Sequence, residues 1–420
     1  MKKNIIFIVI AFFASSLTFA GGFQVSLHSA QNVGMGLVGT SLSSSPSCIF
    51  YNPGALSFVP GVVNVSFGAN FMMPTTKFSD TTGYSAKSKF SVDYPFYLYA
   101  SVNFLKRFAF GIGAYTPFGS ATTWDNDWKG RYIIQKASLT AIYLQPTISV
   151  KFWKIGIGAG LVYSIGLLEQ DIALEFKKFI PNSPDGQLIV KGKDYRGLGY
   201  NVGILFQPIK RLSIGISYRS KVTMKFKDGD ATFSNIPVAF SALFPASNKM
   251  STDIPLPANL NMGVHFMITD NWLIGVQADY TFWNVYDTTY IDFQTNTAFL
   301  ADQKVANKYK NNWAFRIGSE YKYKMLSFRI GGYFDITPIP SNQVHPQDPG
   351  NSHYGITAGL SIRPIKFISI DIAYLYFHAI ERTTTFKPLG IPATSYPSYG
   401  FKGSYVSSGH SPSIGISIHL

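Results

Sequence analysis

The residue types that carry out catalysis or bind metals are few in this chain, and they do not cluster. Seven histidines are spread over the sequence without the spacing of a metal site, at positions 28, 265, 345, 353, 378, 410 and 419. No Gly-x-Ser-x-Gly, Cys-x-x-Cys or phosphate-binding glycine loop occurs. A hydrolase would need a serine, a histidine and an orienting polar group on one face, and no serine can be assigned to any histidine. We therefore expect no enzyme activity, no metal and no cofactor.

The side chains best suited to bind a ligand are aromatic instead. Two stretches that lack a strand pattern, 119–137 and 171–194, contain a set of large apolar residues: Trp124, Trp128, Phe176, Phe179 and Ile180. This set would suit an alkyl chain or an aromatic ring, because small-molecule sites are mostly apolar. The same side chains could equally pack on each other. Whether these side chains bind a ligand or pack on each other depends on the elements that flank the two stretches.

The composition indicates an outer surface that does not face water. Aromatic residues make up 16% of the chain, and charged residues make up only 14%, against about a quarter in an ordinary globular protein. The formal net charge is +14, but the charges are dispersed, so we expect no nucleic-acid partner. Many of the lysines and arginines fall in short turns, where they could meet anionic lipid headgroups. The single cysteine, Cys48, allows no internal disulfide.

From Val62 onward, apolar and polar residues alternate with a period of two, which is the pattern of strands with two different faces. Ten residues at about 3.3 Å each, tilted by about 40°, span roughly 25 Å, the height of the apolar band of an outer-membrane barrel. The pattern predicts fourteen strands: 62–73, 88–105, 108–118, 138–152, 155–170, 195–208, 211–227, 256–268, 272–286, 311–323, 326–338, 352–363, 366–382 and 401–420.

The connections between these segments alternate between six short turns and seven long loops. That alternation is typical of an even-stranded antiparallel barrel with both termini on the periplasmic side and the long loops outside. Closure also removes the sheet edges that lipid cannot satisfy. A secreted β-sandwich or solenoid is the alternative, but the long strands and the aromatic content disfavour it.

The first sixty residues do not follow the strand pattern. Residues 1–20 combine two lysines, a nine-residue apolar run and a small-residue cleavage site, which predicts a Sec signal peptide that is removed on export. Residues 21–61 are rich in glycine and serine, and we expect them to form a plug, or hatch, inside the lumen of the barrel at 62–420. The predicted class is an all-β transmembrane protein of a Gram-negative outer membrane.

Several motifs in this order resemble the FadL family of outer-membrane transporters for long-chain fatty acids and related hydrophobic compounds. The similarity covers nearly the whole mature chain and lies in GGFQ at 21–24, the S-x-x-x-x-G-M-G run at 29–36, YNPG at 51–54, TPFGSATTW at 116–124, YRSKVTMKF at 218–226, LPANLNMG at 256–263, DYTFWNVYD at 279–287 and FRIGGYFDITPIP at 328–340. The family typically carries Asn-Pro-Ala where this chain has Asn-Pro-Gly.

The resemblance implies a hatch that gates the lumen and a gap in the wall at a kinked third strand, through which the substrate leaves sideways. Asn52, Pro53 and Gly54 would form the hatch gate, and the residues alone predict a tight turn there. Pro117, Phe118 and Gly119 would mark the lateral opening. Proline cannot donate to a β-ladder and glycine permits a bulge, although the same three residues could also simply begin a loop.

The resemblance further implies a cation for a fatty-acid carboxylate. The family's binding lysine falls nearest Lys310, with Lys304 as the second candidate, while the arginine that members can carry on the fifth strand is replaced here near Ile165. We expect a monomer that captures hydrophobic small molecules with its outer loops, contacts outer-membrane lipid and transports by diffusion. An aromatic-hydrocarbon channel and an accessory barrel that binds the protein cargo of a secretion system are the alternatives.

Overall fold

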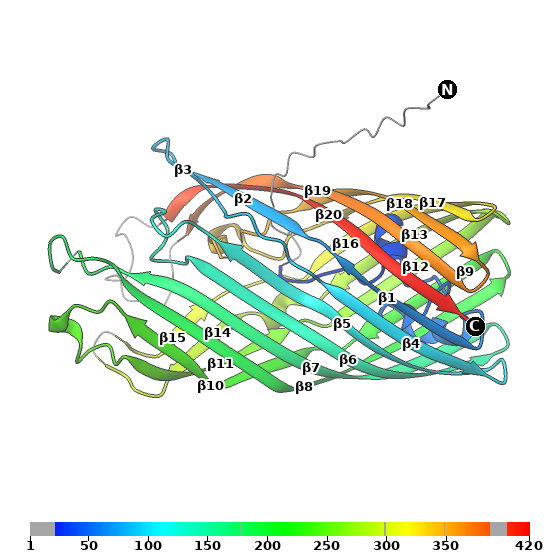
Figure 1. The fold of residues 1–420 in the computed structure, drawn as a ribbon, viewed down its shortest axis with the longest axis horizontal. Coiled ribbons are helices and arrows are strands. Elements are labelled where there is room, and N and C mark those ends of the chain that lie inside the picture. Colours follow the sequence, from blue (N-terminus) through cyan, green and yellow to red (C-terminus); the bar gives the residue numbers. More distant parts are fainter. Residues whose placement is uncertain (1–21, 178, 298–299, 348, 387–400) are drawn as a thin grey trace, which may run out of the picture.

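Tilted strands form the wall of a closed barrel in the computed structural model of this chain (Figure 1). The structure describes residues 22–177, 179–297, 300–347, 349–386 and 401–420. The expected signal peptide at 1–20 lies outside these residues. Within the described part of the chain, no helix is both long and apolar enough to cross a membrane.

The strands are β1 (Val63–Asn70), β2 (Met73–Ser79), β3 (Ser85–Lys87), β4 (Phe96–Phe104), β5 (Phe108–Thr123), β6 (Lys136–Phe152), β7 (Ile155–Leu174), β8 (Gly186–Ile209), β9 (Leu212–Arg219), β10 (Val222–Ser234), β11 (Ser247–Leu256), β12 (Asn259–Thr269), β13 (Trp272–Thr281), β14 (Thr288–Phe293), β15 (Gln303–Ala306), β16 (Asn312–Tyr323), β17 (Leu326–Asp335), β18 (His353–Ile365), β19 (Ile368–Phe386) and β20 (Phe401–His419). The short helices are α1 (Ala30–Gly34), α2 (Cys48–Tyr51), η1 (Pro53–Phe58), η2 (Val238–Phe240), η3 (Trp283–Val285) and η4 (Ser341–Gln343).

These strands confirm the predicted 14-stranded antiparallel barrel. We call each of the fourteen barrel strands a track, since some of them are interrupted. Six tracks consist of two successive strands, and both strands of such a pair bond to the same neighbouring track. These pairs are β1 with β2, β3 with β4, β9 with β10, β11 with β12, β13 with β14, and β15 with β16. The other eight tracks are single strands. The first track closes the barrel on the last, with Val65 opposite Ile418 and Phe67 opposite Ile416.

Four of the six short turns lie where the sequence places them, and the turns expected at 209–210 and 364–365 lie one and two residues later, at 210–211 and 366–367. Together the six turns form one end of the barrel, where the C-terminus also lies (Figure 1). Some strand bounds differ from the predicted ones. The strand expected at 88–105 begins only at Phe96, and the strand expected at 195–208 begins already at Gly186. The wall therefore extends unequally toward the long loops, and on that side β5 extends beyond the end of β4.

The outer face of the wall is apolar where the pattern predicts it. Ile157 and Leu198 are 54% and 72% exposed on the outside of β7 and β8, while the residues that alternate with the outward ones at the start of β7 are buried glycines on the inner face. Fully removing such a side chain from water is worth about 1.5–3 kcal/mol. A strand with this alternation is stable only with lipid on one side and protein on the other.

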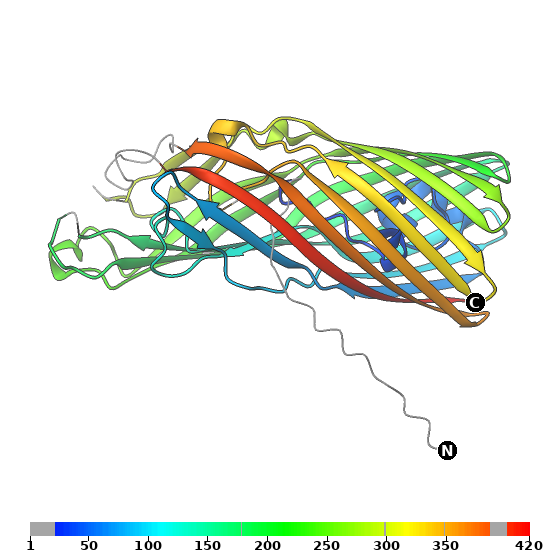
Figure 2. The same cartoon turned by 90° about the horizontal axis from the view of Figure 1, so that it is seen from above.

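The lumen is filled by residues 22–61, here called the N-terminal segment. Its helices α1, α2 and η1 lie inside the barrel toward the end with the short turns (Figure 2). Glycines of the wall allow this close approach. A Cβ atom added to Gly158 would lie 2.3 Å from the Pro53 backbone. A Cβ atom added to Gly215 or to Gly318 would lie 2.1 Å from the carbonyl oxygen of Thr40 or of Met35, respectively.

Candidate functional site

The Asn52-Pro53-Gly54 turn fastens the N-terminal segment to the wall. The Asn52 side-chain amide donates to the carbonyl oxygen of Thr40 (2.8 Å) and to that of Ile204 on β8 (3.0 Å). Its side-chain oxygen accepts from the Gly54 backbone nitrogen (3.0 Å), which caps η1, and Pro53 is the first residue of that helix. A Cβ atom on Gly54 would lie 2.6 Å from the Gly203 carbonyl oxygen. This contact explains glycine where alanine is typical of the family.

Replacing Asn52 by alanine should loosen the N-terminal segment without unfolding the barrel. The buried backbone groups of Thr40 and Gly54 would lose their partner, as would the partly buried carbonyl of Ile204, and each fully buried group costs about 1–3 kcal/mol. We expect amide hydrogen exchange around residues 40–56 to become faster by about tenfold or more, as a loss of 1.4 kcal/mol requires. Asn271→Ala, in an exposed short turn, is the control and should leave this exchange unchanged. Unchanged exchange in Asn52→Ala would contradict the fastening role.

The buried pair of Arg316 and Asp279 also holds the N-terminal segment. The Arg316 guanidinium donates to Asp279, and their side chains are only 4% and 9% exposed. Gln277 connects the pair to the segment, because its amide donates to Asp279 (2.7 Å) while its oxygen accepts from the backbone nitrogens of Gly39 (2.8 Å) and Thr40 (2.9 Å). The charges of β13 and β16 thus position a backbone turn of the segment.

The third track of the wall loses one of its neighbours at the predicted opening. β5 pairs with β4 only as far as Tyr115, whereas its pairing with β6 continues to Thr123 after a register shift between Tyr115 and Phe118. The missing N–H of proline and the glycine that follows it suit such a bulge. β5 is therefore not paired with both wall strands at Phe118 and Gly119.

The N-terminal segment occupies the edge that β4 leaves open. Val25 donates its backbone N–H to the Pro117 carbonyl oxygen, and Gly119 donates to the carbonyl oxygen of Phe23, both at 2.9 Å. Gln24 and Phe118 form the antiparallel bridge between these bonds. Three residues of the segment thus act as a short strand on β5. The role of Pro117, Phe118 and Gly119 as a lateral exit stays a prediction.

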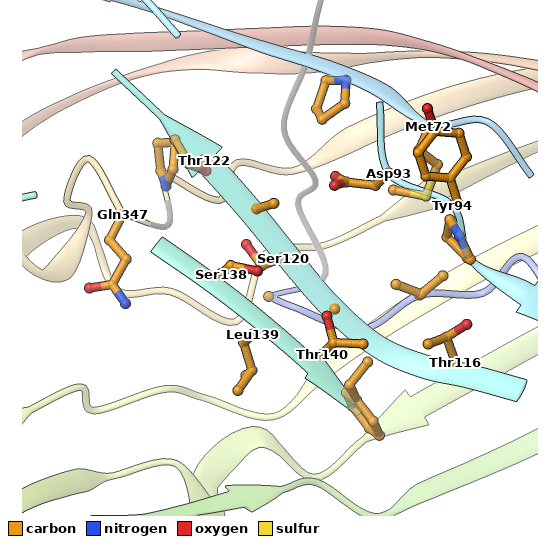
Figure 3. A pocket seen from close by; sticks show the side chains of 18 residues that line it. Met72, Asp93, Tyr94, Thr116, Ser120, Thr122, Ser138, Leu139, Thr140 and Gln347 are labelled. Atoms are coloured by element: carbon orange, nitrogen blue, oxygen red, sulfur yellow. The ribbon is translucent and has the colours of Figure 1, made fainter. Parts of the chain in front are cut away.

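A cavity with about 770 Å³ of empty space lies at this break, and we call it the opening cavity (Figure 3). Met72 and Tyr94 lie at one edge of it and Leu139 at the opposite edge, with Asp93 between β5 and the Met72 side. Phe118 and Gly119 line it from β5, together with hydroxyl side chains of β5 and β6: Thr116, Ser120, Thr122, Ser138 and Thr140.

A second cavity, the lumen cavity, has about 1340 Å³ of empty space, a volume that includes open solvent at its mouth. Its apolar lining comes from the N-terminal segment, from β6, β7 and β11, and from the stretches before and after β14 and β15, and includes Phe23, Leu168, Ile254, Tyr286 and Tyr309. Phe23 and Tyr309 pack against Tyr286 with ring centroids 5.4 and 4.9 Å apart. The polar lining consists of amide and hydroxyl groups and one imidazole. This combination is typical of small-molecule sites.

The two cavities adjoin. Ser120, Ser138, Leu139 and Gln347 line both of them. The N-terminal segment lies at the boundary, because Phe23 lines the lumen cavity and Val25 lines the opening cavity. These are the two residues whose backbones bond to the edge of β5.

The predicted aromatic residues form two separate groups, and neither lines the two cavities. Trp124 and Trp128 are buried and stacked on each other, with centroids 4.2 Å apart, and their indole nitrogens donate to Pro346 and Ile134. Phe176 is buried against Phe240 (5.2 Å). Phe179 also packs against Phe240 (5.5 Å) but stays 45% exposed. Their role in substrate binding stays a prediction.

The two predicted lysines are exposed and do not line the cavities either. Lys304 lies on β15 between Gln303 and Val305, which both face the lumen cavity. Because side chains alternate along a strand, Lys304 points to the other face, where its ammonium lies 5.4 Å from the centre of the Tyr290 ring. Lys310 is attached by its backbone N–H to the Pro338 carbonyl oxygen (2.8 Å).

Sequence reasoning missed most of the lumen cavity. The sequence pattern places Tyr286 at the end of a strand and Tyr309 in a loop, and it indicates no ligand contact for either residue. It also predicts no strand at Met250, Thr252 and Ile254, which alternate along β11. That alternation is a usable signal, because it runs directly before the predicted strand at 256–268.

His345 also lines the lumen cavity, and burial lowers the pKa of its imidazole to about 4, so this side chain is neutral at pH 7. Among the described residues, no group of three or more His, Cys, Asp or Glu could hold a metal ion.

An apolar outer wall, a filled lumen and a cavity at a break in the wall define a plugged channel of the outer-membrane type. The model of the family described as outer membrane protein transport protein (OMPP1/FadL/TodX) matches residues 11–410. The chain belongs to this family, as the motifs indicate, and it is an outer-membrane protein.

Relatives and solved structures agree with this assignment. The long-chain fatty acid transport protein of Escherichia coli O6:H1 is 24% identical over 92% of this chain and 93% of the relative. The crystal structure of a Pseudomonas aeruginosa FadL homologue has a TM-score of 0.82 at 20% identity and covers 95% of this chain and 99% of its own. The toluene transporter TbuX of Ralstonia pickettii has a TM-score of 0.69 at 17% identity, with coverages of 93% and 98%.

Proposed function

We propose that this protein is a diffusion channel that takes hydrophobic small molecules from outside the cell and releases them sideways through the wall. The observation that carries the proposal is the edge of β5, which is paired at Pro117 and Gly119 with residues of the N-terminal segment and not with β4. Such a closure can open without breaking the rest of the wall. The named functions of the relatives, fatty acid transport and toluene transport, support a hydrophobic substrate.

The proposed route begins at the long loops. Phe179 and Val238 expose apolar surface there, at 45% and 91% of their areas, and Phe176 supports them from below through Phe240. We assign the capture of substrate to this apolar surface. The stacked pair of Trp124 and Trp128 would hold the surrounding loops in shape. Lys304 and Lys310 would be contacts at the surface during capture.

From the loops the substrate would enter the lumen cavity and then pass Ser120 and Leu139 into the opening cavity. For this step Phe23 and Val25 must leave the edge of β5. The N-terminal segment therefore acts as the hatch, with the Asn52 turn as its fixed point. Release into the membrane follows from the apolar outer surface on both sides of the break.

A reversible crosslink tests this mechanism. In a background without the native thiol (Cys48→Ser), Val25 and Gly119 are replaced by cysteine. A Cβ atom on Gly119 would lie 3.8 Å from a Val25 methyl carbon, a position that the sulfur of a cysteine at residue 25 can take, so the two introduced side chains are neighbours. We expect the oxidised variant to lose uptake of labelled hydrophobic probes (oleyl alcohol, oleate and toluene) and the reductant to restore it.

The matched control places the same crosslink where no movement is proposed. Ser66 and Ser417 face each other across the closure of β1 on β20, with hydroxyl oxygens 3.0 Å apart. Oxidation of the Ser66→Cys, Ser417→Cys variant should leave uptake unchanged. Full uptake in the oxidised Val25→Cys, Gly119→Cys variant would overturn lateral release. If folded wild-type protein took up none of the three probes, the transport function itself would fail and the binding of a protein cargo would become the better hypothesis.

A further inference from the structure

The lining of the lumen cavity and the opening cavity contains no lysine or arginine among the residues that the structure describes. The polar groups of the lumen cavity are hydroxyls, one histidine, the Asn307 amide and four glutamine amides, those of Gln170, Gln303, Gln343 and Gln347. Within the described part of the chain, the one charged side chain that lines the two cavities is acidic: Asp93, at the opening cavity (Figure 3). An anion in these cavities therefore meets one carboxylate and no lysine or arginine of the described residues.

Three cations that neighbour cavity residues in the sequence are directed elsewhere. Lys304 lies between two cavity residues but on the opposite face of β15, over Tyr290. Lys136 precedes the cavity residue Ala137, yet its ammonium lies 2.6 Å from a carboxylate oxygen of Glu169. Arg131 is held by Asp185 at 2.7 Å. His345 does line the lumen cavity, but the pKa of its imidazole is lowered by burial to about 4, so it adds no charge at pH 7.

A carboxylate that enters such a site loses its hydration and gains no ion pair in return. Burying an unpaired charge is far more costly than burying a neutral polar group that finds a hydrogen bond. Glutamine and asparagine side chains offer both donors and acceptors. A hydroxyl, carbonyl or ester group can therefore be satisfied by these amides while its apolar body contacts Phe23, Ile254 and Tyr286.

We infer that this channel selects uncharged hydrophobic molecules that carry a neutral hydrogen-bonding group, such as long-chain alcohols, ketones or esters, and discriminates against carboxylates. The inference rests on the proposed function and specifies its substrate class. It assigns specificity to the amides of the lumen cavity and to Asp93 at the opening cavity. The exposed lysines of the loops then have little influence on which molecule passes.

The test compares three probes of equal chain length at pH 7.5: labelled oleyl alcohol, oleate and 1-octadecene. Cells carry the full-length protein and lack other transporters of this family, and uptake by cells without the protein is subtracted. We expect uptake of the alcohol to exceed that of oleate by about tenfold, which corresponds to 1.4 kcal/mol, and to exceed that of the hydrocarbon severalfold. Equal or faster uptake of oleate would overturn the inference while leaving the transport function intact. Equal or faster uptake of 1-octadecene would overturn the role of the amides.

A cavity variant makes the test independent of the host. Gln303→Lys adds a cation to the lumen cavity, whereas Gln294→Lys makes the same change at an exposed position just after β14 that lines neither cavity. We expect Gln303→Lys to reverse the preference in favour of oleate and Gln294→Lys to leave it unchanged. Asp93→Asn should raise oleate uptake severalfold with the alcohol unaffected. An unchanged preference in Gln303→Lys, with the variant folded by heat-dependent gel mobility, would contradict the assignment of specificity to this cavity.

Discussion

Replacing Gly119 by tryptophan should reduce uptake through this channel by about tenfold or more, equivalent to at least 1.4 kcal/mol on the barrier. The substitution is tolerated locally, because the heavy atoms nearest to an added Cβ are the Leu139 carbonyl oxygen at 3.6 Å and a Val25 methyl group at 3.8 Å. Both are ordinary contact distances. The indole ring then has to occupy the opening cavity, which Gly119 lines. A filled cavity blocks the exit even when the N-terminal segment moves.

The control for this variant adds the same ring to the outside of the wall. Ile157→Trp lies on the lipid-facing side of β7 and should leave both uptake and thermal stability as in wild type. Uptake is measured with the labelled alcohol, and the amount of folded protein in the outer membrane is compared between strains. Wild-type uptake by Gly119→Trp would show that the substrate leaves by another way.

Replacing Asp279 by alanine should destabilise the barrel by about 3–5 kcal/mol, the usual effect of removing one partner from a buried ion pair. Arg316 would keep its charge in a position where only 4% of the side chain is exposed. Gln277 would also lose its acceptor, and the backbone of Gly39 and Thr40 would lose a fixed partner. We expect a lower temperature for heat-induced unfolding in detergent, together with a lumen that leaks small solutes.

An exposed pair of the same chemistry provides the comparison. Asp270 accepts from Arg211 at 3.0 Å in a short turn, where the carboxylate is 88% exposed. Because exposed ion pairs contribute little, Asp270→Ala should melt at the wild-type temperature. Equal melting temperatures for the two variants would mean that water reaches Arg316 and that the pair does not hold the N-terminal segment.

The wall could be predicted from the sequence because lipid imposes a simple rule on it. Every second residue of a spanning strand faces lipid, so Ile155, Ile157 and Leu161 reveal β7 without knowledge of its neighbours. The break in β5 could also be anticipated, since proline and glycine act on the backbone locally. Asn52-Pro53-Gly54 carried a turn signal for the same reason.

The cavities could not be predicted, because their walls come from residues that only the register brings together. Leu139, Ile254 and Tyr309 line one cavity although they are far apart in the sequence. Period-two patterns fix which face a residue takes, but not its height along the barrel relative to the next strand. Trp124 and Phe176 illustrate the converse: their aromatic character is compatible with both ligand contact and mutual packing, and only the structure shows that Trp124 stacks on Trp128 of its own loop and Phe176 packs on Phe240 of another.

The N-terminal segment also sets the order in which the molecule can be assembled. Residues 22–61 lie inside a wall whose last strand closes on the first, and Gly36 donates its backbone N–H to the Thr357 hydroxyl across 321 positions of sequence. Contacts of this separation form late and slowly, since a long loop must close before they contribute. The lumen must therefore be filled while the edges of β1 and β20 are still apart. Until that moment both edges are open to other chains, and the time spent in this state determines how much the protein depends on assembly factors.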